Sequence, residues 1–285
     1  MKHKKFYISF LFVILLSVFF YWNNVHELSV KEGNLKIHII NAGQSDAILI
    51  QGSQTNVMLD SGTIAAEKDV VKYLKSHHIK NIQYAIATHP HEDHIGNFAT
   101  VFDKFRVDQF YLSDAVSTTS IYKQMLQSAL NNNVLYADYK TNGTFSFDGA
   151  EFEILYTDLT GNFDNMNNNS LLLKVTHKNN TFLFCGDAER DAEDAFLRKY
   201  GEYLQSDVIK IAHHGSKTSS MPEFLDIVDP KYALITCGVD KALPNAYTLQ
   251  KLKDRSIEIY RTDYDGNIVI LSDGDTLTFQ THVKE

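Results

Sequence analysis

The order of hydrophobic and polar positions from Leu35 onward predicts a group of short strands followed by alternating strands and helices. Apolar segments at 35–43, 46–52 and 55–62 are separated by glycine-containing turns, which is typical of strands. Apolar residues then recur with the period of a helix over 65–78, and a further apolar run covers 82–89. The first part of the chain is therefore predicted to build a sheet and to cover it with helices.

The rest of the chain repeats this order with different lengths. Helices are predicted after His94 and at 119–133, 191–200, 220–228 and 245–254. Further strands are predicted at 107–114, 134–138, 143–147, 150–157, 170–177, 181–187, 207–214, 231–238 and 257–263. Hairpin turns are expected at Asp148-Gly149, Asn179-Asn180 and Asp265-Gly266. Two such halves predict an α/β (α+β) fold in which two sheets pack face to face with helices outside.

The N-terminal residues have the composition of a membrane anchor. Basic residues at 1–5 precede the segment 6–22, which contains no charged residue, glycine or proline and ends in Tyr-Trp. A predominantly apolar segment of 17 residues is at the lower limit for a bilayer-spanning helix, and no small-residue cleavage motif follows. We expect residues 1–30 to be a cytoplasmic stub, a single-pass anchor and a short tether, with domain 31–285 outside the cell membrane. A cleaved signal peptide and a secreted domain are the alternative.

Composition narrows the class of protein. The chain has 285 residues and is 44% hydrophobic, which is enough for a substantial core. Its net charge of −8 argues against a general polyanion binder, because such binding depends on lysine and arginine. Cys185 and Cys237 lie in separate apolar runs and are expected to be buried free thiols, with a single disulfide as the alternative. Neither lies in a Cys-x-x-Cys pair, so a thiolate metal site is not expected.

The most informative local motif is "IATHPHEDHIGN", residues 86–97, which carries three histidines where a predicted strand ends. Residues two apart in an extended segment point the same way, so His89 and His91 can present two imidazoles to one side. Asp93 and His94 follow one turn later and can face a second position. Imidazole and carboxylate together are the ligand set of Zn²⁺ or Mn²⁺.

This motif and its order among others carry a family resemblance. "THPHEDHIGN" resembles the His-x-His-x-Asp-His signature of the metallo-β-lactamase superfamily. "NAGQSDAILI", "TFLFCGDAE", "VIKIAHHGSKTSS" and "YRTDYDGNIVI" are similar to the hydrolase domain that follows the membrane channel in ComEC/Rec2-type competence proteins. The resemblance runs from about Leu35 to the C-terminus. It implies the four-layer αββα sandwich of metal-dependent hydrolases.

The resemblance also implies a set of two metal sites, with Zn²⁺ expected and Mn²⁺ as the alternative. His89 and His91 would hold the first metal. Asp93, His94 and His213 would hold the second, and Asp187 would bridge both. The residues implied in catalysis are Asp93, Asp187 and His214, the last as a group that orients a ligand or touches substrate. Asp60 in "LDSG" resembles a supporting residue that orients a histidine.

Some positions depart from the family pattern. The loop at 158–169 lacks the third histidine that many relatives supply to the first metal, so Asn169 or Ser170 is expected to be a weak ligand at most. Residues 242–244, Ala-Leu-Pro, stand where relatives commonly have Gly-His-Pro. Ser216 and Lys217 are candidates for contacting substrate oxygens, although a neighbouring serine, Ser219 or Ser220, could instead cap the next helix.

Together these features predict hydrolysis of a phosphomonoester or phosphodiester (class EC 3.1) by a hydroxide shared between two metal ions. The substrate would be nucleic acid or a cell-wall-linked ester. The net negative charge slightly favours the ester, because the chain has no overall basic field to attract nucleic acid. No obligate protein partner is indicated. Two alternatives are a lactonase or β-lactamase type of hydrolase and a non-catalytic binding protein associated with competence and DNA uptake.

Overall fold

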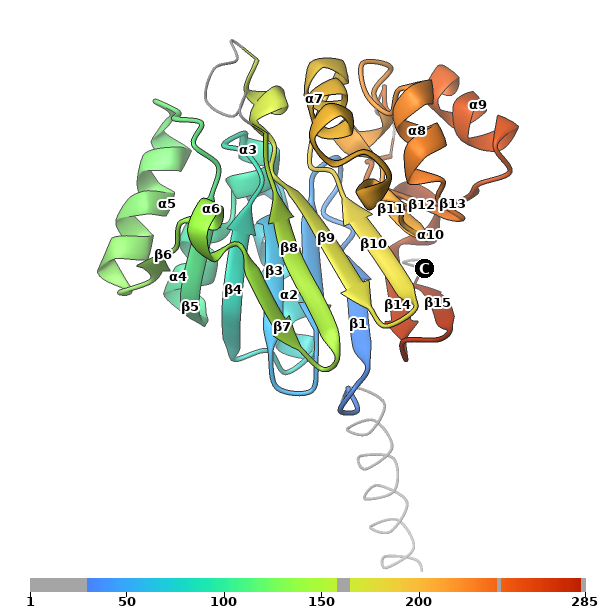
Figure 1. Cartoon of the computed structure of the whole chain (residues 1–285). Helices are drawn as coiled ribbons and strands as arrows, with labels where there is room; N and C mark the ends of the chain where they lie inside the picture. Colours follow the sequence, from blue (N-terminus) through green and yellow to red (C-terminus); the bar gives the residue numbers. More distant parts are fainter. Residues whose placement is uncertain (1–29, 158–164, 240–241, 283–285) are drawn as a thin grey trace, which may run out of the picture.

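The computed structural model describes residues 30–157, 165–239 and 242–282, and within them two β-sheets pack face to face (Figure 1). The first sheet has the spatial order β15 (Leu277–His282), β14 (Asn267–Ser272), β1 (Leu35–Ile39), β2 (Ala47–Gln51), β3 (Asn56–Ser61), β4 (Asn81–Ala87), β5 (Arg106–Leu112) and β6 (Leu135–Tyr136). The second has the order β13 (Glu258–Arg261), β12 (Tyr232–Ile235), β11 (Val208–Lys210), β10 (Asn180–Phe184), β9 (Leu172–His177), β8 (Ala150–Leu155) and β7 (Thr144–Phe147).

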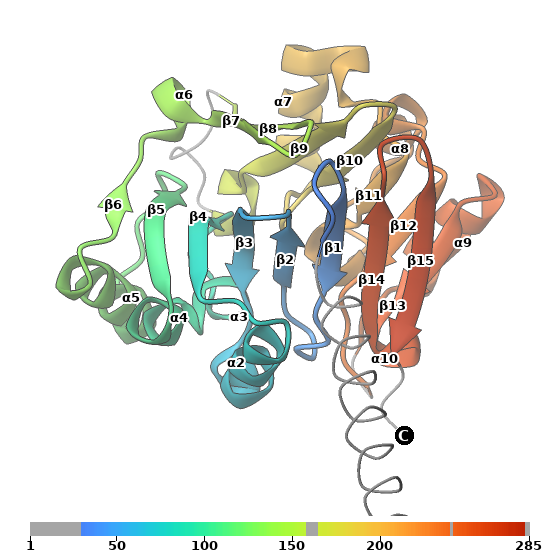
Figure 2. The ribbon, with the colours of Figure 1, turned by 90° about the horizontal axis from the view of Figure 1, so that it is seen from below.

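Helices cover the outer faces of both sheets, as Figure 2 shows from below. The α-helices are α2 (Glu67–Ser76), α3 (Glu92–Ile95), α4 (Phe98–Lys104), α5 (Ser120–Asn131), α6 (Tyr139–Asn142), α7 (Arg190–Tyr200), α8 (Pro222–Val228), α9 (Ala246–Asp254) and α10 (Thr262–Asp265). Short 3₁₀ turns are η1 (Ile64–Ala66), η2 (Met166–Asn169), η3 (Gly201–Leu204) and η4 (Ala212–Gly215). Helices α2, α4 and α5 lie under the first sheet and α7, α8 and α9 over the second, so the predicted four-layer αββα sandwich is confirmed.

Alternation along the strands explains how the layers form. In β1, Ile37 and Ile39 belong to the apolar core between the sheets, whereas His38 points to the other face and meets Tyr73 of α2. The core between the sheets also contains Phe152 and Phe182, both without exposed surface. Burying an aromatic or aliphatic side chain of this kind contributes roughly 1.5–3 kcal/mol. Hydrophobic contact between the two inner faces thus holds the sandwich together.

Two of the predicted hairpins differ in the structure. The turn at Asp148-Gly149 joins β7 to β8 as predicted, but the next hairpin turns one residue earlier than expected, because Asn180 already pairs with His177. The hairpin predicted at Asp265-Gly266 is wrong. Strand β13 belongs to the second sheet and β14 pairs with β1 in the first, so α10 and Gly266 carry the chain from one sheet to the other.

The predicted anchor at 6–22 lies outside the described residues, so the structure does not test it. In the part of the chain that the structure does describe, none of the helices combines the length and the apolar content of a membrane span. Cys185 and Cys237 are buried and unbridged, as the sequence predicts.

Candidate metal centre

The motif at residues 86–97 forms a sharp connection between β4 and α3. Strand β4 ends at Ala87, and His91 is the extended residue directly before α3. The helix was expected to follow His94, but it begins at Glu92 because the backbone turns immediately after Pro90-His91. Asp93 and His94 therefore lie in the first turn of α3.

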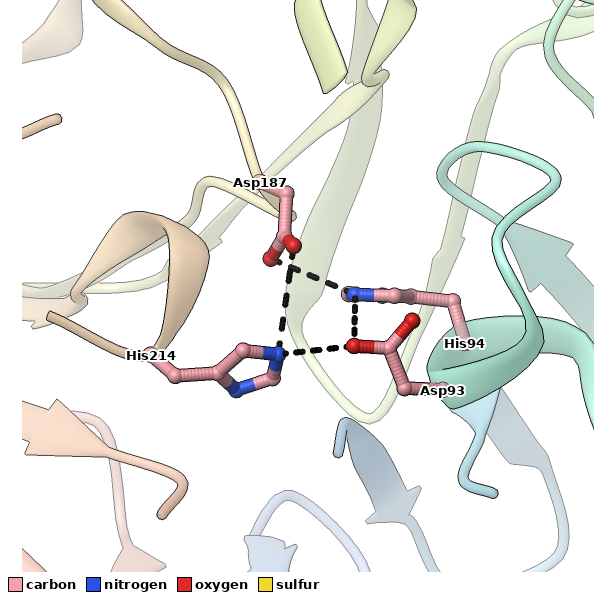
Figure 3. A group of neighbouring side chains, drawn as sticks. All are labelled: Asp93, His94, Asp187 and His214. Atoms are coloured by element: carbon pink, nitrogen blue, oxygen red, sulfur yellow. Dashed lines mark hydrogen bonds and ion pairs between the residues drawn. The ribbon is translucent and has the colours of Figure 1, made fainter. Parts of the chain in front are cut away.

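Four side chains from distant parts of the sequence meet at this point (Figure 3). Asp93, His94, Asp187 and His214 each offer a ligand atom, and these atoms all lie within 4.8 Å of one another. His94 Nε2 is 3.2 Å from Asp187 Oδ1, and His214 Nε2 is 3.3 Å from Asp93 Oδ2. Asp187 follows β10 and His214 follows β11, which are parallel neighbours, so their carboxyl ends bring both side chains to the same edge.

The first two histidines of the motif lie beside this group. His89 Nε2 is 3.0 Å from His91 Nδ1, and the ring centroids of His89 and His94 are 4.1 Å apart. His89 is fully buried and its Nδ1 lies 3.1 Å from Thr88 Oγ1 and 3.3 Å from Ser170 Oγ. The structure therefore brings His89 and His91 together, next to the four grouped side chains.

The two histidines of "HHGS" occupy different positions from those that strand alternation predicted. Strand β11 ends at Lys210, and both His213 and His214 have positive φ, at 50° and 51°. His214 is the residue that joins the group, and its Nδ1 lies 2.9 Å from the carbonyl oxygen of Thr236. His213 is 27% exposed, its Nδ1 lies 3.0 Å from Glu189 Oε1, and its Nε2 is 4.0 Å from Asp187 Oδ2. The geometry thus favours His214 over His213 as the ligand of this group.

Asp60 supports His94 from behind. Asp60 Oδ2 lies 2.8 Å from His94 Nδ1, and the same carboxylate accepts hydrogen bonds from the backbone N–H and hydroxyl of Thr88. An acceptor at Nδ1 fixes the tautomer that leaves Nε2 free to bind a metal. This is the orienting position that the sequence suggested for Asp60.

The carboxylates dominate the electrostatics of the group. Burial alone would raise the pKa of Asp187, but the charges of the His94 and His214 imidazoles hold it well below its ordinary value. Burial alone would lower the pKa of His94, yet the neighbouring Asp187 and Asp60 raise it well above its ordinary value. In His89, burial and the nearby His94 lower the pKa. The site therefore stabilises positive charge strongly at its centre.

A divalent cation suits this arrangement of side chains. His94 Nε2 and Asp187 Oδ1 face each other while buried, and neither makes a hydrogen bond of adequate geometry among the described residues. Buried polar atoms without partners are costly unless an ion or water satisfies them. Two imidazoles and two carboxylates form a donor set that Zn²⁺ and Mn²⁺ accept, with His89 and His91 available beside it.

A family model decides the relationship of this fold to known proteins. The model described as "Metallo-beta-lactamase superfamily" matches residues 40–239. The chain belongs to the metallo-beta-lactamase superfamily. The span includes each of the six grouped or neighbouring side chains, so the superfamily fold and the local motif agree.

Competence proteins are homologous to this superfamily member over most of its length. Competence protein ComA of Neisseria gonorrhoeae is 27% identical over 241 residues, covering 84% of this chain and 32% of the relative. ComE operon protein 3 of Bacillus subtilis (strain 168) is 25% identical over 253 residues, with 82% and 32% covered. The chain thus spans about a third of the length of these relatives, and the predicted resemblance to ComEC-type proteins is confirmed.

Two solved structures superpose on most of the chain with low sequence identity. The metallo-beta-lactamase fold protein YhfI from Bacillus subtilis has a TM-score of 0.59 at 13% identity and covers 84% of this chain and 99% of its own. Igni18, a metallo hydrolase from Ignicoccus hospitalis, has a TM-score of 0.54 at 13% identity, with coverage of 83% and 98%. These likenesses support the superfamily fold.

The weaker candidate residues of this superfamily member are distributed around the centre. Ser170 is buried, its Oγ lies near His89 and accepts a hydrogen bond from the Asp187 N–H at 3.1 Å. Asn169 is buried and donates to the Asn165 carbonyl at 3.3 Å. Ser216 Oγ lies 2.9 Å from Thr218 Oγ1. Lys217 is exposed on the same loop.

The N-terminus of helix α8 is not capped by Ser219 or Ser220, the alternative considered from the sequence. The N-cap position is Met221, whose side chain makes no capping hydrogen bond. The Glu193 carboxylate of α7 instead accepts hydrogen bonds from the N–H groups of Ser220 and Met221, at 2.6 and 2.8 Å.

The segment of residues 242–244 packs against Gly215, the residue after His214. A Cβ added at Gly215 would lie 2.6 Å from Pro244 Cβ.

Sequence reasoning missed three residues that lie beside the site: one pairs with His213, and two lie beside members of the group. Glu189 pairs with His213, the Thr236 carbonyl lies beside His214 Nδ1, and Lys210 lies 3.9 Å from Asp187 Oδ1. Lys210 had a readable signal, since a lysine inside the apolar strand "DVIKIA" is unusual unless it is paired. Glu189 and Thr236 had none, because their roles depend on contacts across the fold.

Proposed function

We propose that the chain is a membrane-anchored, extracytoplasmic hydrolase of phosphate esters that depends on two divalent metal ions. The observation that carries the proposal is the cluster of Asp93, His94, Asp187 and His214, all within ligand reach of one another and mostly buried. In this revised assignment His214 takes the metal-binding role first given to His213.

The roles of the side chains follow from their positions. His89 and His91 would hold one ion, Asp93, His94 and His214 the other, and Asp187 would contact both. When bound, such ions supply Lewis acidity that activates water and stabilises negative charge on phosphate oxygens. The donor set supports Zn²⁺ as the first candidate, with Mn²⁺ as the second.

The exposed side of the cluster indicates where substrate would approach. The Asp93 side chain is 32% exposed, whereas His94, Asp187 and His214 are nearly inaccessible. Asp93 would therefore accept a hydrogen bond from the attacking water and align it. His213, whose Nε2 is 4.0 Å from Asp187 Oδ2, and its partner Glu189 are also partly accessible, with 27% and 16% exposure. Their hydrogen-bonded pair would position polar groups of the substrate or leaving group.

The neighbouring loop after His214 is suited to a phosphate ester. Lys217 is exposed there and offers an ammonium that can donate hydrogen bonds to phosphate oxygens. Ser216 is buried and its Oγ pairs with the Thr218 hydroxyl, so Lys217 is the stronger candidate of the two. A lactonase or β-lactamase reaction would be served less well, because the loop before β9 provides asparagines where a third histidine for the first metal would be needed.

Two substrate classes are open within this proposal. Homology to the relative named competence protein ComA, together with the resemblance to ComEC/Rec2-type competence proteins, favours nucleic acid. The net charge of −8 favours a smaller or wall-linked ester, because the chain offers no general field that attracts polyanions. A non-catalytic role in DNA uptake is the remaining alternative.

The decisive experiment measures metal content and hydrolysis together. The full chain is purified in mild detergent, its bound metal is quantified by mass spectrometry, and it is assayed against bis-p-nitrophenyl phosphate, single-stranded DNA and nitrocefin. We expect about two metal ions per chain and turnover of a phosphate substrate. Turnover of nitrocefin alone would contradict the phosphoesterase proposal, and metal binding without any turnover would favour the non-catalytic role.

The proposed location has a separate test. If residues 6–22 anchor the chain, it should resist extraction from membranes by alkaline carbonate. The domain should also be digested by a protease added outside intact spheroplasts. Recovery of the mature protein from the medium, starting after residue 22, would indicate a cleaved signal instead.

A further inference from the structure

A fully buried lysine lies directly behind the proposed metal centre. Lys210 is the last residue of β11, is 1% exposed and forms a short ion pair with Asp46 Oδ2. Its Nζ also donates to the Gly186 carbonyl at 3.0 Å and lies 3.9 Å from Asp187 Oδ1. A charged lysine in this position needs such partners, because an unpaired buried ammonium is strongly unfavourable.

Asp46, the partner of Lys210, reaches both halves of the centre. It lies between β1 and β2, 164 positions before Lys210 in the sequence. Its backbone N–H donates to the Asp93 carbonyl at 3.0 Å, and its carboxylate lies 3.7 Å from His94 Nδ1. The other carboxylate oxygen accepts from the Thr236 hydroxyl and is 3.6 Å from His214 Nδ1. Asp46 therefore touches or adjoins three of the four grouped residues.

Lys210 is linked to Asp187, the fourth grouped residue, through the Gly186-Asp187 peptide. The carbonyl of Gly186 accepts from Lys210 Nζ and from the His213 N–H at 3.1 Å, while the Asp187 N–H donates to Ser170 Oγ at 3.1 Å. Both sides of this peptide are thus held. The direction of the Asp187 carboxylate follows from that fixed backbone.

We infer that the Asp46–Lys210 pair is a positioning device that aligns the N-terminal and C-terminal halves of the metal centre. Asp93 and His94 come from the first half, Asp187 and His214 from the second, and the pair is bonded to the supports of both. Lys210 also neutralises Asp46, so this buried carboxylate is not left unpaired behind the centre. The inference rests on the metal binding in the proposed function, and neither residue touches substrate.

The test is a double-mutant cycle on the full chain with Mn²⁺ as the probe. Wild type, Asp46→Asn, Lys210→Met and the double variant are titrated with Mn²⁺ by electron paramagnetic resonance, and melting is followed by circular dichroism. We expect each variant to bind Mn²⁺ at least about tenfold more weakly, as for residues that orient metal ligands. The double variant removes both buried charges and leaves neither unpaired, so it should fold even if one of the single variants does not. If a single variant does not fold, the Mn²⁺ affinity of the double variant is the measurement that tests the positioning role.

Lys174→Met is the matched control. Lys174 is also buried, but its Nζ donates to the carbonyls of Tyr203 and Gln205, outside the metal centre. It should lower the melting temperature and leave Mn²⁺ affinity unchanged. Wild-type affinity in the folded double variant would overturn the positioning role, as would absence of Mn²⁺ binding by wild type. Mn²⁺ binding by wild type without hydrolysis would overturn only the proposed activity.

Discussion

His94 lies between two carboxylates at opposite edges of its ring: Asp60 Oδ2 is 2.8 Å from Nδ1, and Asp187 Oδ1 is 3.2 Å from Nε2, on the side of the proposed metal position. His94 and Asp60 are almost completely buried. A histidine that donates from Nδ1 to a carboxylate presents the lone pair of Nε2, which is the form that binds metal. Asp60 therefore determines how His94 acts without entering the group itself.

Replacing Asp60 by Asn should weaken metal binding. Asp60 has a φ of 52°, which Asn tolerates better than most residues, so the backbone is preserved. Loss of the negative acceptor should reduce metal affinity by about 10- to 100-fold. Calorimetric titration with Zn²⁺ measures it. Asp207→Asn is the control, because Asp207 pairs with Thr181 and Lys231 and should leave the affinity unchanged. Equal affinities in both variants would contradict the role of Asp60.

Asp187→Ala should remove both metal ions while the fold is retained. Asp187 lies near His94, His214 and His213, so its carboxylate is the group most central to the site. Metal content is measured by mass spectrometry and the fold by circular dichroism. Unchanged metal content would rule out a bridging role.

The neighbouring histidines give a paired prediction. His214→Ala should weaken metal binding by more than the 10- to 100-fold typical of supporting residues, because His214 lies inside the group. His213→Ala should change metal content little and affect the Michaelis constant for a phosphate substrate, since His213 is partly exposed and paired with Glu189. Metal analysis and steady-state kinetics on both variants test this. The opposite pattern would restore the assignment of His213 as the ligand.

Glu193 predicts a pH-dependent stability. Burial raises the pKa of Glu193 from 4.5 to about 7, against the hydrogen bonds from Met221 and Ser220 that lower it. The folded protein holds this proton more tightly than the unfolded chain, so protonation of Glu193 stabilises the fold. The stabilisation is complete below pH 4.5 and is lost as the pH rises through about 7. One pKa unit is about 1.4 kcal/mol, so the free energy of unfolding should change by roughly 3 kcal/mol over this range.

Glu193→Gln is the variant that measures this effect. Gln keeps the shape of the protonated acid but does not titrate. The unfolding free energy of wild type, relative to the variant, should therefore fall between pH 4.5 and 7 in urea denaturation. Parallel stability curves for the two proteins over this range would show that Glu193 does not titrate as described.

Local pattern was sufficient where neighbours in sequence are neighbours in space. The alternation of apolar residues predicted the strands. The motif spacing placed His89 and His91 on one side of a strand end and Asp93 and His94 at a second position close by, because a strand end and a helical turn have fixed side-chain directions. Asp187 was identified from its place at the end of an apolar strand together with the family resemblance. These inferences needed no contact between distant segments.

Tertiary structure decided the rest. The choice between His213 and His214 depended on two positive φ values after β11, where strand alternation no longer holds. The pairing of Lys210 with Asp46 joins residues 164 positions apart, and the separation of β13 from β14 depended on which sheet each one completes. The sequence by itself thus determined the local directions of side chains. Only the packing of the two sheets decided which distant groups meet, because burial and charge pairing act through space and not along the chain.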